Sequence, residues 1–385
     1  VGVLLSGSIG YARATDAALG PNGSIRLTAG SITSAGDLTL SSSGFLDAAA
    51  VNLTAAAGQT IGAGSDANGP YNFTVRSQDT MLLAAAGGVV DFAGNLVIGS
   101  ADEGARHRIG AAAAGNNAPG GLVQVGGDLL VDSSLLAFSG GSQRGGEIEV
   151  TIGDGGAIAV GGRMVLSSDG SATEDDFGTS AFGGRAVLTM TGANASLTVG
   201  GDLTISAQAR PFFQNCECFQ PPSGSGTGGY AAFTATGGMI EAGALNVSAS
   251  AEAFSSFYGE AGADLDATGG TALVSLGDSA AAFESIGVYA EAQGASAPQG
   301  PDGGDALGGS ASFSKGAGGS LATQGIVVSA DASGGDDGQA EVTPGDPPDI
   351  DIDVDSKNNN RSSATGIGEG GAGGRPPADV VWRAD

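Results

Sequence analysis

The stretch GGRAVLTMTGANASLTVGGDLTISAQA, residues 183–209, decides the fold. It opens on two glycines and then alternates apolar residues with small or polar ones in three short runs, which is the period of a β-strand. Successive side chains of a strand point to opposite faces, so each run has one apolar face. The residues predicted to point inward are Ala186, Leu188, Met190, Leu197, Val199, Leu203, Ile205 and Ala207.

The same unit is written five times between residues 145 and 332. Its Gly-Gly starts lie 38, 45, 41 and 39 residues apart. The inward slots of the unit from Gly145 hold Ile148, Val150, Ile152, Ile158, Val160, Met164, Leu166 and Ser168, and those of the unit from Gly228 hold Ala231, Phe233, Ala235, Ile240, Ala242, Leu245, Val247 and Ala249. A repeat of this length indicates stacked units, each of which buries its apolar face against its neighbours.

Three strands and three corners per unit predict a triangular coil. We therefore expect an all-β protein, a parallel β-helix (β-solenoid), in which coils stack at roughly 4.8 Å. Parallel crossovers are generally right-handed, so the helix is predicted to be right-handed. The Gly-Gly, Gly-Ala or single Gly between runs would supply the left-handed or bulged backbone of the corners. The variable loops after each third strand leave from one corner and are predicted to stack on one side.

Three regions follow from this pattern. Residues 1–119 are predicted to form N-terminal coils with an interruption near residues 101–119, residues 120–332 regular repeats with long loops, and residues 333–385 an acidic tail, linker and terminal strand. In the first region the strand cores at residues 25–27, 38–40 and 51–53 recur every 13 residues, close to a third or half of one turn. The only histidine, His107, lies between two arginines in the interruption and is expected to be a solvated loop residue.

Residues 24–64, SIRLTAGSITSAGDLTLSSSGFLDAAAVNLTAAAGQTIGAG, and residues 80–100, TMLLAAAGGVVDFAGNLVIGS, carry this simpler pattern. They resemble the passenger solenoids of filamentous-haemagglutinin-like exoproteins and autotransporter adhesins. In looser form the resemblance extends over most of residues 20–332. It implies a secreted or cell-surface bacterial rod, located outside the cell.

Composition narrows the partners. The formal net charge is −27, from 41 acidic and 14 basic residues, and such a surface would repel nucleic acid and anionic membranes. No run of 18 apolar residues occurs, so no membrane span is expected. Hydrophobic residues make up 41% of the chain and fall in register, which argues against a disordered Gly/Ala/Ser polymer.

The long loops carry aromatic residues at three consecutive repeats. These candidate binding residues are Phe177, Phe182, Phe212, Phe213, Phe219, Phe254, Phe257 and Tyr258. Exposed together, they would form an apolar strip for a receptor, a host or surface glycan, or a sister filament. Alternatively, they pack down as a satellite cluster that covers one face of the solenoid.

The acidic tail offers a candidate metal site. Asp349, Asp351, Asp353 and Asp355 alternate with Ile or Val, so a strand would place the four carboxylates on one face. Calcium takes such oxygen ligands, and it is the one cofactor that the sequence suggests. The alternative is an edge strand whose outward charges prevent aggregation. Cys216 and Cys218, both in one loop, are a candidate disulfide.

One inward slot breaks the pattern. In the unit from Gly308 the third slot holds Lys315, and a buried lysine is costly unless it is paired. We therefore expect either a frayed strand or a one-residue slip of phase at this point.

No catalytic constellation is visible. Outward positions of the repeated strands are mostly Thr, Ser, Ala and Gly, a Ser/His/Asp set has only His107 to draw on, and no phosphate loop occurs. The sequence thus predicts a protein that is not an enzyme. The first hypothesis is the shaft of a bacterial filament, built by coil stacking and end-to-end contacts between copies of the chain. The second is an adhesin rod that binds a receptor or glycan through its aromatic loops.

The inward assignment can be tested by Leu203→Asp. This change would bury an unpaired charge at a cost of several kcal/mol, so the affected coil should unfold at lower temperature. Thermal denaturation followed by circular dichroism measures the effect, and an unchanged melting curve would refute the assignment.

Overall fold

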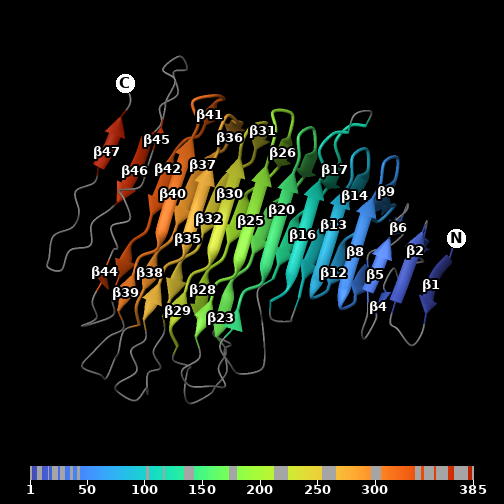
Figure 1. Ribbon diagram of the computed structural model, residues 1–385, viewed down its shortest axis with the longest axis horizontal. Coiled ribbons are helices and arrows are strands. Elements are labelled where there is room, and N and C mark those ends of the chain that lie inside the picture. Colours follow the sequence, from blue (N-terminus) through green and yellow to red (C-terminus); the bar gives the residue numbers. More distant parts are fainter. Residues whose placement is uncertain are drawn as a thin grey trace.

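The computed structural model shows an all-β rod. It describes residues 44–100, 104–115, 118–133, 143–172, 180–211, 224–253, 266–295 and 305–333, together with the shorter strands outside these ranges whose bounds are given below. In the described part, three long sheets run along the rod and contain no helix. Figure 1 shows the strands side by side along the long axis, with the N-terminus at one end and the C-terminus at the other. The predicted parallel β-helix is therefore confirmed, whereas its handedness stays a prediction.

Each coil contributes one strand to each of three sheets, named here sheets 1, 2 and 3. Sheet 1 contains, in order, β1 (Gly2–Ser6), β2 (Tyr11–Thr15), β5 (Ser31–Ser34), β8 (Ala50–Ala55), β13 (Asp79–Ala84), β16 (Arg106–Ala111), β20 (Glu147–Ile152), β25 (Arg185–Met190), β30 (Tyr230–Ala235), β35 (Thr271–Ser275), β40 (Ser310–Lys315) and β45 (Asp351–Ile352). Sheet 2 contains β3 (Ala17–Leu19), β6 (Leu38–Leu40), β9 (Thr60–Ala63), β14 (Val89–Phe92), β17 (Leu122–Val125), β21 (Ala157–Val160), β26 (Ser196–Val199), β31 (Met239–Glu241), β36 (Ala280–Ala282) and β41 (Leu321–Ala322). Sheet 3 contains β4 (Ile25–Arg26), β7 (Gly44–Asp47), β12 (Phe73–Arg76), β15 (Leu96–Gly99), β18 (Leu129–Asp132), β22 (Met164–Ser167), β27 (Leu203–Ser206), β32 (Ala244–Ser248), β37 (Ser285–Tyr289), β42 (Ile326–Ser329), β46 (Ser363–Ile367) and β47 (Val380–Arg383).

The strands of these sheets pair in parallel, with two exceptions at the ends. β1 is antiparallel to β2, and β47 is antiparallel to β46. A separate small hairpin, β10 (Ser65–Asp66) with β11 (Gly69–Pro70), is inserted between sheets 2 and 3. The C-terminal strand was predicted, and it pairs with a strand of its own chain.

The length of a coil changes along the chain. Tyr11, Ser31 and Ala50 occupy equivalent positions in sheet 1, so the first turns take 20 and 19 residues. The cores at residues 25–27, 38–40 and 51–53 belong to sheets 3, 2 and 1, with one strand between each pair. A 13-residue interval is therefore about two thirds of a turn, and the predicted third or half was wrong because single polar-looking strands lie between the apolar ones.

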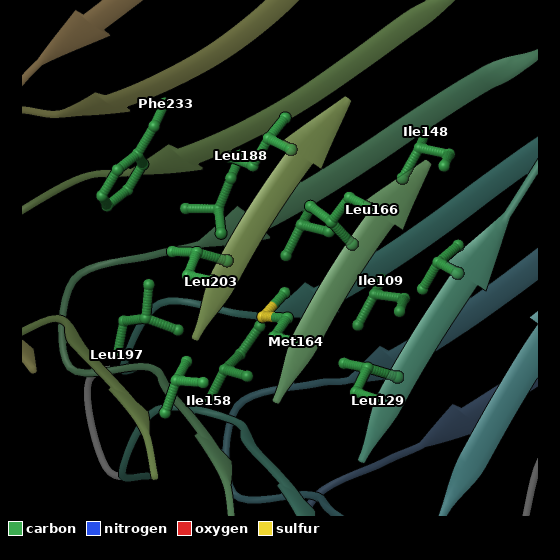
Figure 2. Close-up of a cluster of buried hydrophobic side chains, with 14 of the residues drawn as sticks. Ile109, Leu129, Ile148, Ile158, Met164, Leu166, Leu188, Leu197, Leu203 and Phe233 are labelled. Atoms are coloured by element: carbon green, nitrogen blue, oxygen red, sulfur yellow. The ribbon is translucent and has the colours of Figure 1, made fainter. Parts of the chain in front are cut away.

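The core is a continuous stack of inward side chains. Every inward residue predicted for the units from Gly145, Gly183 and Gly228 is buried. Figure 2 shows how residues such as Ile148, Leu188 and Phe233 of neighbouring strands follow one another along the interior. Each is paired in register with the same slot of the next coil, so its apolar contacts come from the coils on either side.

Two sets of glycines have different roles. A glycine with positive φ recurs at the corner between sheets 1 and 2, as in Gly155 (76°), Gly192 (96°) and Gly238 (91°), which is the left-handed backbone that was predicted for corners. The Gly-Gly that opens each unit does not use it. A Cβ on Gly184 would lie 2.2 Å from the carbonyl oxygen of Gly146, and one on Gly229 would lie 2.1 Å from that of Gly184. The opening glycines are therefore required by close packing of backbone on backbone.

A side-chain ladder closes the corner between sheets 2 and 3. The backbone N–H of Asn95 donates to Oδ1 of Asn72 (2.9 Å), that of Asp128 to Oδ1 of Asn95 (2.8 Å), and that of Arg163 to Oδ1 of Asp128 (3.0 Å). Asp202 accepts in the same way from the N–H of Ala244 (2.8 Å). Each side chain thus satisfies a corner N–H of the following coil, which would otherwise have no strand partner.

The glycine requirement gives a matched pair of substitutions. Gly229→Ala should lower the free energy of unfolding by at least about 2 kcal/mol, because the added methyl group meets backbone atoms that cannot move independently. Gly64→Ala is the control, since nothing lies within 4 Å of its Cβ position. Thermal and urea denaturation would measure both, and equal stability of the two variants would contradict this role of the opening glycines.

Candidate functional site

The predicted loops begin and end as short strands that project from one corner of the rod. The outgoing strands are β23 (Gly170–Ala172), β28 (Ala209–Pro211), β33 (Ala251–Glu252), β38 (Ala292–Gln293) and β43 (Ala332–Ser333). The returning strands are β19 (Gln143–Arg144), β24 (Ala181–Phe182), β29 (Gly226–Thr227), β34 (Ala267–Thr268), β39 (Ala306–Leu307) and β44 (Ala340–Glu341). We call each outgoing and returning pair with its loop an arm. Figure 1 shows the labelled arm strands together along one edge, as predicted for loops stacked on one side.

The bases of the arms share a core of their own. It consists of buried alanines: Ala181, Ala209, Ala251, Ala253, Ala267, Ala292, Ala295 and Ala306. Alanine is small enough for the outgoing and returning strands to lie close together. The arm bases are therefore regular elements that repeat from coil to coil.

Most of the predicted binding residues lie outside the described residues. Phe177, Phe212, Phe213, Phe219, Phe254, Phe257 and Tyr258 belong to this group, as do Cys216 and Cys218. Phe182 is described: it is half-buried in β24, and the guanidinium of Arg144 lies 5.5 Å from its ring centroid. This cation–π contact joins adjacent returning strands. Whether the aromatic residues form an exposed strip or a packed cluster stays a prediction.

The acidic tail is described only in part. Asp351 and Ile352 form β45, in register with Ser314 and Lys315 of β40. Asp349, Asp353 and Asp355 lie outside the described residues, so the calcium site stays a prediction. Among the described side chains, no three of His, Cys, Asp and Glu come together in a way that could hold a metal ion.

His107 is in the core, so its prediction as a solvated loop residue was wrong. It is the second residue of β16, is fully buried, and lies in register between Thr80 and Ile148. Neither ring nitrogen has a hydrogen-bond partner of normal geometry. Burial lowers the pKa of His107 to about 4, against the opposing effects of the Asp79 charge and the Asp132 backbone. The alternation Arg106, His107, Arg108 was a readable strand signal, with the charges outward.

Lys315 neither frays the strand nor shifts its phase. β40 stays in register with β35, and Lys315 is its last inward residue, 7% exposed. Its ammonium donates to the carbonyl oxygens of Gly277 (2.8 Å), Gly316 (2.9 Å) and Gly318 (2.8 Å). Burial lowers the pKa of Lys315, and the charge of Asp278 opposes the shift. The buried charge is tolerated because three turn carbonyls surround it.

A polar seam marks the corner from which the arms leave. The carboxylate of Asp169 accepts hydrogen bonds from the hydroxyls of Ser167 and Ser206 and from the backbone N–H of Gln208. Burial raises the pKa of Asp169, and these hydrogen bonds and Arg210 oppose the rise.

The seam continues into the next coils. The amide of Gln208 donates to Ser248 (2.5 Å), and the N–H of Glu291 donates to Ser250 (3.1 Å). Ser329 then donates to Glu291 (2.7 Å). Sequence reasoning missed this seam because its members differ in residue type from coil to coil.

The outer face of sheet 1 carries a cluster of ion pairs. Glu147 lies between Arg106 (3.5 Å) and Arg185 (3.2 Å), and Arg108 pairs with Glu149 (3.9 Å). The guanidinium of Arg185 also lies 5.7 Å from the ring centroid of Tyr230 on the next strand. These side chains are roughly half exposed, so each pair by itself contributes little to stability.

Comparison with protein-family models, with curated proteins and with solved structures finds no match to this chain. Within the described ranges, no helix has the length and hydrophobicity needed to cross a membrane. The function must therefore be argued from the rod itself.

The buried histidine predicts acid sensitivity. The folded-state pKa of about 4 lies below the ordinary value of 6.5, so the unfolded chain takes up the proton first as the pH falls. The free energy of unfolding should then decrease from about pH 6.5 downward, by roughly 3 kcal/mol once pH 4 is reached. Hydrogen exchange of the β16 amides at pH 7 and 5.5 would detect the change.

His107→Leu is the matched control because it keeps an apolar group of similar size at this position. The chain has no other histidine, so the slope between pH 7 and 5.5 should disappear in this variant. The raised pKa of Asp169 acts in the opposite direction and is present in both proteins. An identical pH slope in wild type and variant would contradict the assignment.

Proposed function

We propose that this chain is the shaft of a secreted or cell-surface bacterial filament, in which copies of the chain join end to end. The observation that carries the proposal is the unbroken stack of coils. Sheets 1 and 3 each hold twelve strands, and one apolar core runs through the described coils. Such a stack resists bending because every coil is hydrogen-bonded to both neighbours along its whole perimeter.

The end strands support end-to-end assembly. Sheet 1 ends on β1 at one end of the rod, and sheet 3 ends on β47 at the other. A strand that ends a sheet has backbone N–H and C=O groups on its outer side, and these can pair with a strand of another chain. A copy added there would extend the sheets in the direction in which they already run.

An adhesin rod is the second candidate, favoured by the arms. Their alanine cores hold the two ends of successive loops in register along one edge. Loops that begin and end on such a base are presented to a partner as a row, and the aromatic residues between the bases would supply the contact with a receptor or glycan.

Electron microscopy of purified protein tests the first candidate. Twelve strands at about 4.8 Å per step give a chain length of roughly 50 Å along the axis. We expect continuous fibres with an axial repeat that is a multiple of this length. Isolated rods of one chain length at all concentrations would contradict the shaft proposal.

A variant separates the two candidates. Phe212→Ser with Phe213→Ser changes an arm loop and leaves the coils intact, so it should form fibres like the wild type if the chain is a shaft. Glycan-array or cell-binding signal that is present in the wild type and lost in this variant would instead favour the adhesin.

A further inference from the structure

The outward side chains of β13, β16, β20 and β25 form a patterned surface, which we call the charged face. In one row across these strands stand Asp79, Arg106, Glu147 and Arg185, in adjacent register. In the next outward row stand Met81, Arg108, Glu149 and Val187. Charge therefore alternates along the rod axis in both rows.

The charged face is neutral on a strongly acidic chain. Its three carboxylates and three guanidinium groups cancel, whereas the chain has a net charge of −27. Two copies of the chain repel each other at long range, and this repulsion is least where such neutral faces meet.

The ion pairs within one copy leave unused capacity. The exposed fractions are 59% for Arg106, 38% for Glu147 and 46% for Arg185, and the nitrogen–oxygen distances of 3.2–3.9 Å are long for charge-assisted hydrogen bonds. A guanidinium has five donors, so each arginine can bind a second carboxylate from outside.

We propose that two copies of this chain pair laterally, face to face and antiparallel, through the charged face. The two-fold axis lies in the interface between β16 and β20, parallel to the strands. It reverses the rod direction and keeps each row opposite its own copy, so the contact is isologous.

A row of four alternating charges is the complement of its own reverse. In the first row, Arg106 meets Glu147 of the second copy, and Asp79 meets Arg185. In the second row, Arg108 meets Glu149. The apolar Met81 meets the apolar Val187. Every charged group of the face therefore has an opposite charge in front of it.

The strands beyond the charges are compatible with the same pairing. β8 would lie against β30 of the second copy, which brings Ala50 opposite Tyr230, Asn52 opposite Ala232 and Thr54 opposite Thr234. None of these side chains is charged, so nothing opposes close approach.

The size of the contact predicts its strength. Six strands of six residues cover roughly 600 Å² on each partner, or about 1,200 Å² in total, at the lower limit of specific interfaces. The pairing should therefore be reversible and sensitive to salt.

A parallel arrangement does not fit. A two-fold axis along the rod, passing through the second row, would place Arg108 against Arg108 and Glu149 against Glu149 of the other copy. Like charges at contact distance are strongly unfavourable. The charge pattern thus selects the antiparallel pair.

This lateral contact is separate from the end-to-end contact of the proposed shaft. It uses the side of sheet 1, whereas filament growth would use the end strands. Loss of lateral pairing would leave fibre formation standing, and absence of fibres would leave the dimer standing.

Charge reversal in trans tests the pairing. One variant carries Glu147→Arg and Glu149→Arg, and the other carries Arg106→Glu and Arg108→Glu. Each variant places like charges opposite each other in its own dimer, so each should sediment as a monomer in low salt. An equimolar mixture restores every opposite pair between the two copies and should form a heterodimer.

The mixture distinguishes pairing between copies from ion pairs within one copy. Both variants lose their internal ion pairs, and mixing cannot restore those. Sedimentation velocity of the wild type at up to about 0.1 mM should show a dimer in low salt that dissociates at about 1 M salt. A monomeric wild type in low salt, a dimer formed by either variant alone, or a mixture that stays monomeric would overturn the proposal.

Cysteine cross-linking tests the same geometry with the charges intact, in case either variant fails to fold. Leu83 in one copy faces Thr189 in the other. In a Cys216→Ser and Cys218→Ser background, Leu83→Cys mixed with Thr189→Cys should give oxidised heterodimers. Neither protein alone should cross-link at an equal rate, and equal rates in all three samples would overturn the antiparallel register.

Discussion

The fold depends on backbone hydrogen bonds that join each coil to the next in register. This pairing fixes which residue lies above which, so an inward slot in one coil is inward in its neighbours. It also brings the backbones of successive coils together where the arms rejoin the rod, and there a single methyl group would collide with a carbonyl oxygen. The opening Gly-Gly follows from this approach, and the core, the ladders and the arms are arranged around it.

The sequence was sufficient for the coil interior and much less so for the corners. Strict alternation assigned every inward residue of three units correctly, because a one-residue slip would move the whole apolar set to solvent. His107 was misplaced because its strand has no Gly-Gly start and only one long aliphatic residue, Ile109. Lys315 was judged by side-chain type alone, whereas the carbonyl oxygens that stabilise it come from turns in two coils. Contacts of this kind depend on three-dimensional proximity that local patterns do not record.

The acidic residues are not only a surface charge. Asp128 and Asp202 accept corner N–H groups of the following coil, and Asp169 accepts three hydrogen bonds beside the arms. Asn72 and Asn95 make the same ladder contact without a charge, so the oxygen atom is what the corner requires. An Asn or Asp just before the first inward residue of the third strand was a readable signal for this ladder, although its recurrence is imperfect.

The necks of the arms separate what varies from what is fixed. In four successive coils a backbone N–H of the second opening glycine donates to the carbonyl of the last core residue, from Gly184 to Ser168, Gly229 to Ala207, Gly270 to Ala249 and Gly309 to Ala290. The paired residues are 16, 22, 21 and 19 positions apart, yet each distance is 2.7 or 2.8 Å. An arm can therefore lengthen, shorten or change sequence without altering the register of the rod, much as the teeth of a comb can differ while their pitch is constant. The rod is in this sense a ruler: evolution or a protein engineer can graft unrelated peptides at intervals of about 4.8 Å along one edge.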